Sequence, residues 1–186
     1  MDRPTVAPAK LTIAQRSGSI VVRTGPGPEV VATGARVTHD APGTARVESA
    51  SGNIEVTCPE GTDVILGTSS GKVRLVGRLG DVRVTASSGS VHIEAAQRVD
   101  VRARSGSIEI GECEGECHVV AVSGRIEIRR AGAIDVTGVS GTIVAGSVAG
   151  GRVRTTSGKV SVGLDRAADL DVRGVSSSIT VAALLG

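Results

Sequence analysis

The sequence predicts an all-β protein, a single parallel β-solenoid (β-helix) of about nine to ten rungs with 17–19 residues each. A Ser-Gly pair recurs along the chain at spacings of 17 to 19 residues, with one double spacing of 34. Aliphatic residues alternate on both sides of each pair, which is the period of a strand with one buried face. The chain has no Phe, Tyr or Trp, so its interior must be lined by Val, Ile, Leu and Ala.

The Ser-Gly pair marks the corner between the two strands of each rung. A sharp corner requires a positive φ, which glycine adopts without a Cβ clash, and we expect the serine to hydrogen-bond backbone close to it in sequence. The spacing of 34 between Gly18 and Gly52 is twice 17, so a degenerate rung is expected near Gly34-Ala35. The predicted corner residues are Ser51, Gly52, Ser70, Gly71, Ser88, Gly89, Ser105, Gly106, Ser123, Gly124, Ser140, Gly141, Ser157 and Gly158.

Four positions around each corner are predicted to point inward and to stack from rung to rung into aliphatic columns. Counted from the glycine they are −7, −5, +2 and +4, and of the 36 residues at these positions only Gly151 lacks an apolar side chain. Equivalent residues of successive rungs, such as Ile108 and Ile126, are therefore expected in contact. The outward positions are polar, and Glu55 and Arg74 are expected to face each other on neighbouring rungs.

The chain is predicted to be one solenoid domain over residues 11–181, with an N-terminal cap or tail over 1–10 and an apolar C-terminal tail over 182–186. No helix longer than one turn is expected, and Leu164 to Leu170 is the best candidate for a short one. A polar capping helix is missing from the pattern, so we expect one end of the rod to self-associate or dock, with Leu184 and Leu185 as candidate contacts.

Composition excludes several classes of partner. The formal net charge is only +2 and no aromatic side chain is present to stack on bases, so no nucleic acid partner is expected. No run of 18 apolar residues encodes a membrane span. Met1-Asp2-Arg3-Pro4 lacks the apolar core of a signal peptide, and three cysteines form no disulfide framework. These features favour the cytoplasm, and the cell surface is the alternative if an export signal lies outside this sequence.

The sequence predicts no catalytic residue, no metal site and no cofactor. The spacing of Cys113, Cys117 and His118 differs from that of a zinc site, and Cys117 occupies the −7 column, where it serves as a small buried hydrophobe. The corner serines have no base and acid beside them in sequence. Gly67 to Lys72 lacks the helix that follows a phosphate loop. The lack of aromatics argues against a carbohydrate-active enzyme.

Two segments carry a family resemblance. Cys58-Pro59-Glu60-Gly61-Thr62-Asp63-Val64 leads into a series of Ser-Gly-x-Val/Ile-x-Val strands, and Gly77 to Val84 continues the pattern. Over nearly its whole length the chain resembles a bacterial adhesin-like family of β-strand-repeat proteins, a domain family of unknown function. The resemblance implies a right-handed β-helix and transfers no catalytic residue. A more distant similarity links the chain to bactofilins, which are polymerising β-helical cytoskeletal proteins.

The function expected from these features is a non-catalytic β-helical scaffold that binds a protein partner not identified by the sequence. A homo-oligomer joined through a solenoid end is part of this expectation. The alternatives are a filament-forming cytoskeletal protein of bactofilin type and a cell-surface adhesin domain.

Overall fold

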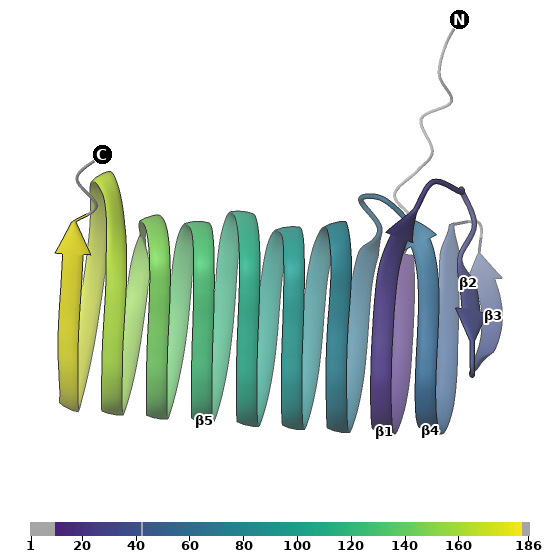
Figure 1. Cartoon of the computed structure of the whole chain (residues 1–186), viewed down its shortest axis with the longest axis horizontal. Coiled ribbons are helices and arrows are strands. Elements are labelled where there is room, and N and C mark those ends of the chain that lie inside the picture. The colour runs from purple at the N-terminus through teal and green to yellow at the C-terminus, as the bar shows by residue number, and fades with distance from the viewer. Residues whose placement is uncertain (1–9, 42, 184–186) are drawn as a thin grey trace, which may run out of the picture.

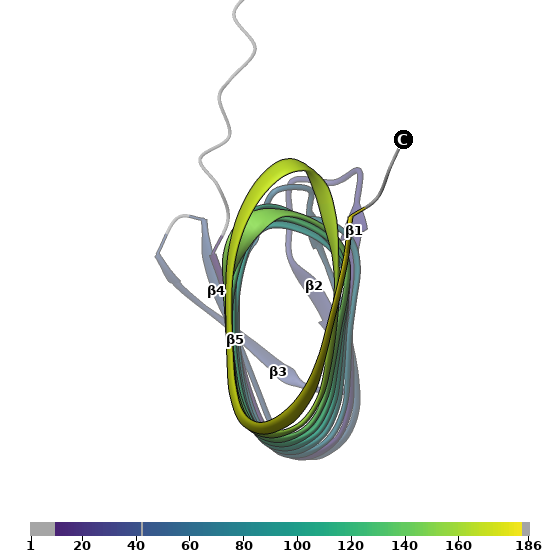
Figure 2. The ribbon, with the colours of Figure 1, turned by 90° about the vertical axis from the view of Figure 1, so that its left-hand side faces the viewer.

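The computed structural model describes residues 10–41 and 43–183, which form an all-β, solenoid-like fold. Its strands are β1 (Lys10–Gly25), β2 (Val31–Thr33), β3 (Arg36–Ala41), β4 (Thr44–Pro59) and β5 (Asp63–Ala183). The ribbon winds in successive turns along the long axis of the molecule (Figure 1), and each turn is an elongated oval when viewed along that axis (Figure 2). β5 is one uninterrupted strand because its backbone keeps pairing with the adjacent turn around every corner.

The described part of the chain contains no helix, and hence no helix long and apolar enough to cross a membrane. The expected helical turn between Leu164 and Leu170 is therefore wrong, since this stretch continues β5 as strand. Pairing with the preceding turn satisfies the backbone of the segment, and a helix there would interrupt that ladder.

The four aliphatic columns form the core. Their side chains are buried from the first rungs up to the rung of Gly158, where Val153, Val160 and Val162 are still at most 2% exposed. Ile108 and Ile126 are each 2% exposed in the same cluster. Burying one such side chain contributes about 1.5–3 kcal/mol, so the stacked columns are the main source of stability.

A fifth inward column comes from the return segments, which the sequence analysis treats only as variable connections. Its members lie six to eight residues after the corner glycine and are buried. The variable spacing hides this column from a fixed-period alignment. Its residues are Cys58, Leu79, Ala96, Cys113, Ala131 and Val148.

The order of the rungs differs from the order of the repeats in the sequence. β1 pairs in parallel with β4 on one side and with β5 on the other, so Gly18 lies between Gly52 and Gly71. Figure 1 shows β1 between β4 and the first turns of β5. The expectation that the repeats stack in their sequence order is therefore wrong at this end of the rod. The expected pair of Glu55 and Arg74 is also wrong, because Val21 of β1 pairs with both residues and separates them.

The segment Pro59 to Asp63 carries the chain across β1. Thr62 is fully buried, and its hydroxyl donates a hydrogen bond of 2.6 Å to the carbonyl oxygen of Pro59. The backbone N–H of Gly61 donates to the carbonyl of Arg78 at 3.0 Å. The carboxylate of Asp63 accepts a bond of 2.9 Å from the N–H of Asp81. The connection is thus tied to the first turn of β5 that follows it.

The segment between β1 and β4 covers the end of the rod. β2 and β3 pair antiparallel with the outer edge of β4, with Val31 opposite Thr57 and Arg36 opposite Glu48. Val30, Ala32, Ala35 and Val37 pack against the core. The region of Gly34-Ala35 is therefore a reverse-running cap, and the expected degenerate rung within the stack is wrong. Of the predicted cap at residues 1–10, only Lys10 is described, and it begins β1.

Candidate functional site

The predicted corner glycines lie in one column along the rod. From Gly18 to Gly158 their φ angles range from +114° to +141°, which is a region that side chains with a Cβ rarely adopt. A Cβ on Gly106 would collide with the carbonyl oxygen of Gly89, and the same contact repeats from glycine to glycine along the column. The corner column is therefore built for close approach of backbones, and it offers no side-chain chemistry.

The corner serines connect neighbouring rungs. The hydroxyl of Ser105 donates to the carbonyl of Ser87 in the preceding rung at 3.5 Å, and Ser140 bonds Val122 likewise at 3.4 Å. The expectation that these serines bond backbone close in sequence is wrong for the described bonds. The local bond comes instead from position −3, where the hydroxyl of Thr155 donates to the carbonyl of Ser157 at 3.1 Å. Ser88 and Ser157 repeat the inter-rung bond, and Ser49 and Thr68 repeat the local one.

The inter-rung hydrogen bonds give the repeated corner serines a structural role. A nucleophilic serine requires a base that accepts its proton, whereas these hydroxyls direct their protons at carbonyl oxygens. His92 and His118 instead pair with Glu109 and Asp135 on the outer surface. The structure does not bring a corner serine and an imidazole together among the described hydrogen bonds.

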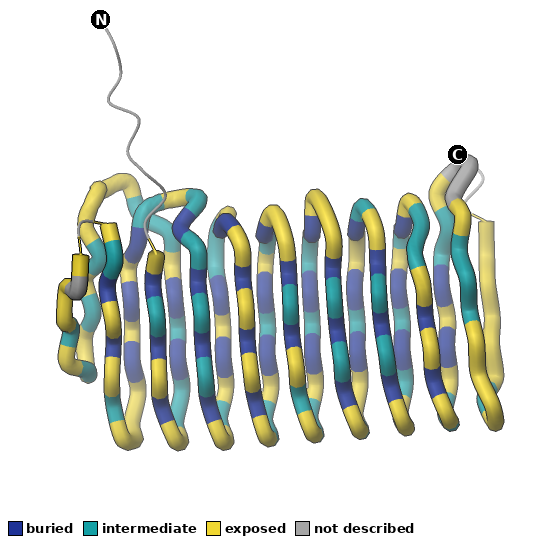
Figure 3. The backbone as a smooth tube through the Cα atoms, turned by 180° about the vertical axis from the view of Figure 1, so that it is seen from behind, coloured by how far each residue is buried: buried dark blue, intermediate teal, exposed yellow. Residues whose placement is uncertain are grey.

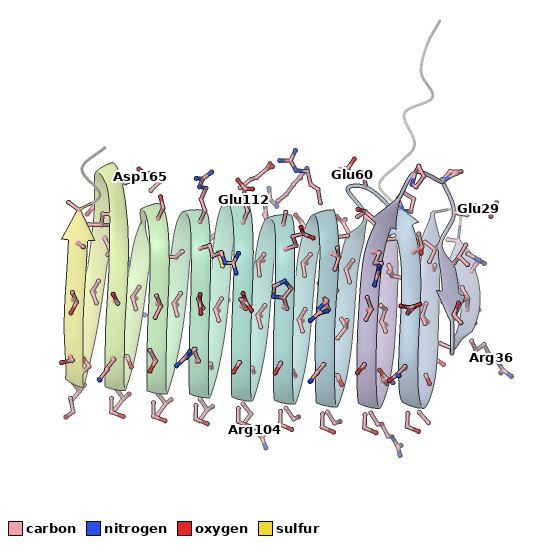
Figure 4. The ribbon with its side chains drawn as sticks, in the orientation of Figure 1. Glu29, Arg36, Glu60, Arg104, Glu112 and Asp165 are labelled. Carbon is pink, nitrogen blue, oxygen red and sulfur yellow. The ribbon has the colours of Figure 1, made fainter. Side chains whose placement is uncertain are left out.

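Outward charges form ladders of opposite sign between rungs. Arg129 and His92 both contact the carboxylate of Glu109, at 3.0 and 3.1 Å. The hydrogen bond from His92 is the main cause that lowers the pKa of Glu109, and the charge of Arg129 adds to it. Figure 4 shows Arg104 and Glu112 pointing away from the coil. Exposed pairs of this kind contribute little stability, and they leave the surface nearly neutral.

The described residues include no group of three or more His, Cys, Asp or Glu side chains that could hold a metal ion. Cys113, Cys117 and His118, which the sequence analysis rejects as a metal site, are divided between core and surface. Cys113 and Cys117 are buried free thiols, whereas His118 pairs outside with Asp135 at 3.8 Å. The structure thus brings the two thiols together and leaves the imidazole apart.

The two ends of the rod differ. The end at β4 is covered by the short strands β2 and β3, whereas none of the described strands covers the last turn of β5 (Figure 3). In that turn Ile179 and Val181 occupy core columns but are 42% and 47% exposed, and Val175 is 83% exposed. Residues 174–183 carry no charged side chain. Leu184 and Leu185, the predicted contacts, lie outside the described residues.

The last turn of β5, called the terminal rung below (residues 170–183), is the feature best suited to bind another protein. No strand among the described residues lies beyond the outer edge of its backbone, and its core side chains present apolar surface. Natural edge strands usually carry charges that prevent such pairing, and residues 174–183 lack them.

Comparison with known proteins gives a family. No curated protein matches the sequence. A family model described as Toastrack DUF4097 matches residues 9–183, which span the coil from the start of β1 to the end of β5. The chain therefore belongs to the Toastrack DUF4097 family, whose function is not established.

Proposed function

We propose that this chain is a non-catalytic scaffold that associates with a second copy of itself through the terminal rung. The observation that carries the proposal is the difference between the two ends: β2 and β3 cover one, while Ile179 and Val181 remain exposed in core columns at the other. Contact between two such ends would bury both sets of side chains. Each buried aliphatic side chain adds about 1.5–3 kcal/mol.

A second copy suits the terminal rung because the same edge occurs on both partners. Two ends related by a two-fold axis across the rod pair their strands antiparallel and keep inward side chains inward. The uncharged segment 174–183 offers no like charges that would oppose this arrangement. The edge and the columns of one copy therefore complete those of the other.

The cap favours a closed pair over a filament. A filament requires association at both ends, but the outer edge of β4 is already occupied by β2 and β3. These strands have three and six residues, and edge strands this short present little template for pairing. The bactofilin-type filament is thus the second candidate, and the uncharged segment 174–183 of the terminal rung is the feature that supports it.

A scaffold role also agrees with the engaged polar groups. The corner hydroxyls bond carbonyl oxygens, and many outward carboxylates pair with arginines. We further propose that the coil is right-handed with about nine rungs, as expected for parallel crossovers, and that the scaffold works in the cytoplasm. A cell-surface adhesin domain remains the alternative location and role.

Val181→Lys is expected to convert the two-copy form into single chains, because a lysine in the contact would place two like charges against each other and expose an apolar column. Val181 is 47% exposed in the isolated chain, so its replacement should leave folding almost unchanged. Sedimentation velocity over a wide range of protein concentration measures the masses.

Val31→Lys is the matched control, since Val31 is 59% exposed at the capped end. It is expected to leave the two-copy form intact. A wild-type chain that stays single at every concentration would refute self-association. Loss of association in the Val31 variant alone would show that the contact lies at the capped end. Filaments in electron micrographs would favour the bactofilin-type protein.

A further inference from the structure

We propose that Cys113 and Cys117 form a reversible modification site, in which an oxidant of the peroxide or small-molecule disulfide class joins the two thiols in one intrachain disulfide. The site lies in the middle of the rod, so it is separate from the terminal rung and from the proposed self-association. Cys58 is distant in sequence and donates its own thiol to the carbonyl of Arg23 at 3.7 Å.

The first argument is position. Cys113 belongs to the return column and Cys117 to the −7 column, and they flank the exposed turn Glu114-Gly115-Glu116. Cys117 hydrogen-bonds the sulfur of Cys113, whose own thiol donates to the carbonyl of Gln97 at 3.8 Å, and both residues are at most 1% exposed. The fold therefore holds two thiols together inside one rung, beneath a turn that borders solvent.

The second argument is that packing does not require the pair. In neighbouring rungs the same two columns hold aliphatic residues, Ala96 with Val99 and Ala131 with Ile134. Alanine, valine and isoleucine fill the positions there and are at most 4% exposed. The thiols thus add a chemical property that the core itself does not need.

The third argument is the unequal character of the two thiols. The hydrogen bond from Cys117 lowers the pKa of Cys113, whereas the same bond and burial raise the pKa of Cys117. Cys113 is accordingly the nucleophile and Cys117 the group that keeps its proton. Only a thiolate attacks peroxide or a disulfide at a useful rate.

The reaction balances with peroxide as the two-electron acceptor. The sulfur of Cys113 attacks one peroxide oxygen, the O–O bond breaks, and Cys113 becomes a sulfenic acid while one water leaves. The sulfur of Cys117 then attacks the sulfur of Cys113, the S–O bond breaks, and the second water leaves with the proton of Cys117. With a small-molecule disulfide, two thiols of that molecule leave instead of two waters.

The test treats the folded full chain with hydrogen peroxide, blocks remaining thiols with an alkylating agent in denaturant, and measures intact mass and peptides. The expected product carries one blocked thiol, at Cys58, and one disulfide between Cys113 and Cys117 that dithiothreitol reverses. The Cys58→Ala variant should form the same bond. The same chain unfolded in guanidinium chloride should form it more slowly and should mix all three cysteine pairs.

Two outcomes would overturn the proposal. One is three blocked thiols in the folded chain under conditions that oxidise the unfolded chain. The other is oxidation of the folded chain to a mixture of pairs that includes Cys58. Cys113→Ser and Cys117→Ser, which keep two thiols each, should leave both unpaired, and a disulfide to Cys58 in either variant would also count against a preformed pair.

Discussion

Gly106→Ala is expected to lower the free energy of unfolding by about 3 kcal/mol or more. Gly106 has a φ of +126°, which is costly for any residue with a Cβ. The new Cβ would also collide with the carbonyl oxygen of Gly89, and the atoms that it meets are all backbone atoms of Gly89, so no side-chain shift can relieve the contact. Because Gly106 lies in the middle of the column, the damage would reach the rungs on both sides. Urea unfolding followed by circular dichroism measures the effect.

The chain offers two matched controls for this substitution. Gly52 has a φ of +114° at the same corner position, but nothing lies within 4 Å of an added Cβ because it ends the column. Gly52→Ala should therefore cost only the conformational part, about 1–2 kcal/mol. At Gly67 a Cβ meets nothing and φ is not positive, so Gly67→Ala should change stability by less than about 0.5 kcal/mol. Equal effects at all three glycines would contradict the close-packed corner column.

Ile20→Ala is expected to cost about 2–5 kcal/mol, the range for removing a fully buried isoleucine side chain. Ile20 is 1% exposed and lies between Ile54 of β4 and Val73 of β5, which pair with it on either side. The cavity left by alanine would be enclosed by these rungs. Urea unfolding of the wild type and the variant gives the difference.

Ile179→Ala is the control, since Ile179 occupies the same +2 column but is 42% exposed in the terminal rung. In single chains, at a protein concentration too low for self-association, its replacement should cost less than about 1 kcal/mol. If the repeats stacked in sequence order, Ile20 would also lie in an end rung and the two variants would behave alike. A small effect of Ile20→Ala would therefore argue against the internal position of β1.

The features that repeat in every rung could be predicted from the sequence. Strict alternation around the Ser-Gly pair identifies the inward positions, since strand side chains point to opposite faces in turn. The corner needs glycine for steric reasons, and glycine occurs there in eight of the nine copies, with Ser177 in the last. The sequence located the expected self-association site at one end of the rod only in part. The exposed Ile179 and Val181 lie in the last described turn, while Leu184 and Leu185 fall outside the described residues.

The order of the first rungs could not be predicted, because the repeats are nearly interchangeable. Ile20, Ile54 and Val73 fill the same column equally well in either order. Two features distinguish the observed order from the sequence order, namely the crossover at Pro59 to Asp63 and the prolines Pro26 and Pro28 before the cap. Neither feature indicates which rungs are neighbours. The contact of Cys113 with Cys117 was hidden for a related reason, since the return segments vary in length.

Cysteine cross-linking at the corner tests the rung order most directly. Ser19 of β1 pairs with Asn53 of β4 and with Lys72 of β5, so one strand separates the latter two. Adjacent strands lie about 4.8 Å apart, and a disulfide requires Cα atoms within about 7 Å. In a chain with its native cysteines replaced by alanine, Ser19→Cys with Lys72→Cys should form a disulfide, and Asn53→Cys with Lys72→Cys should not. A disulfide in the second pair and none in the first would contradict the position of β1 between β4 and β5.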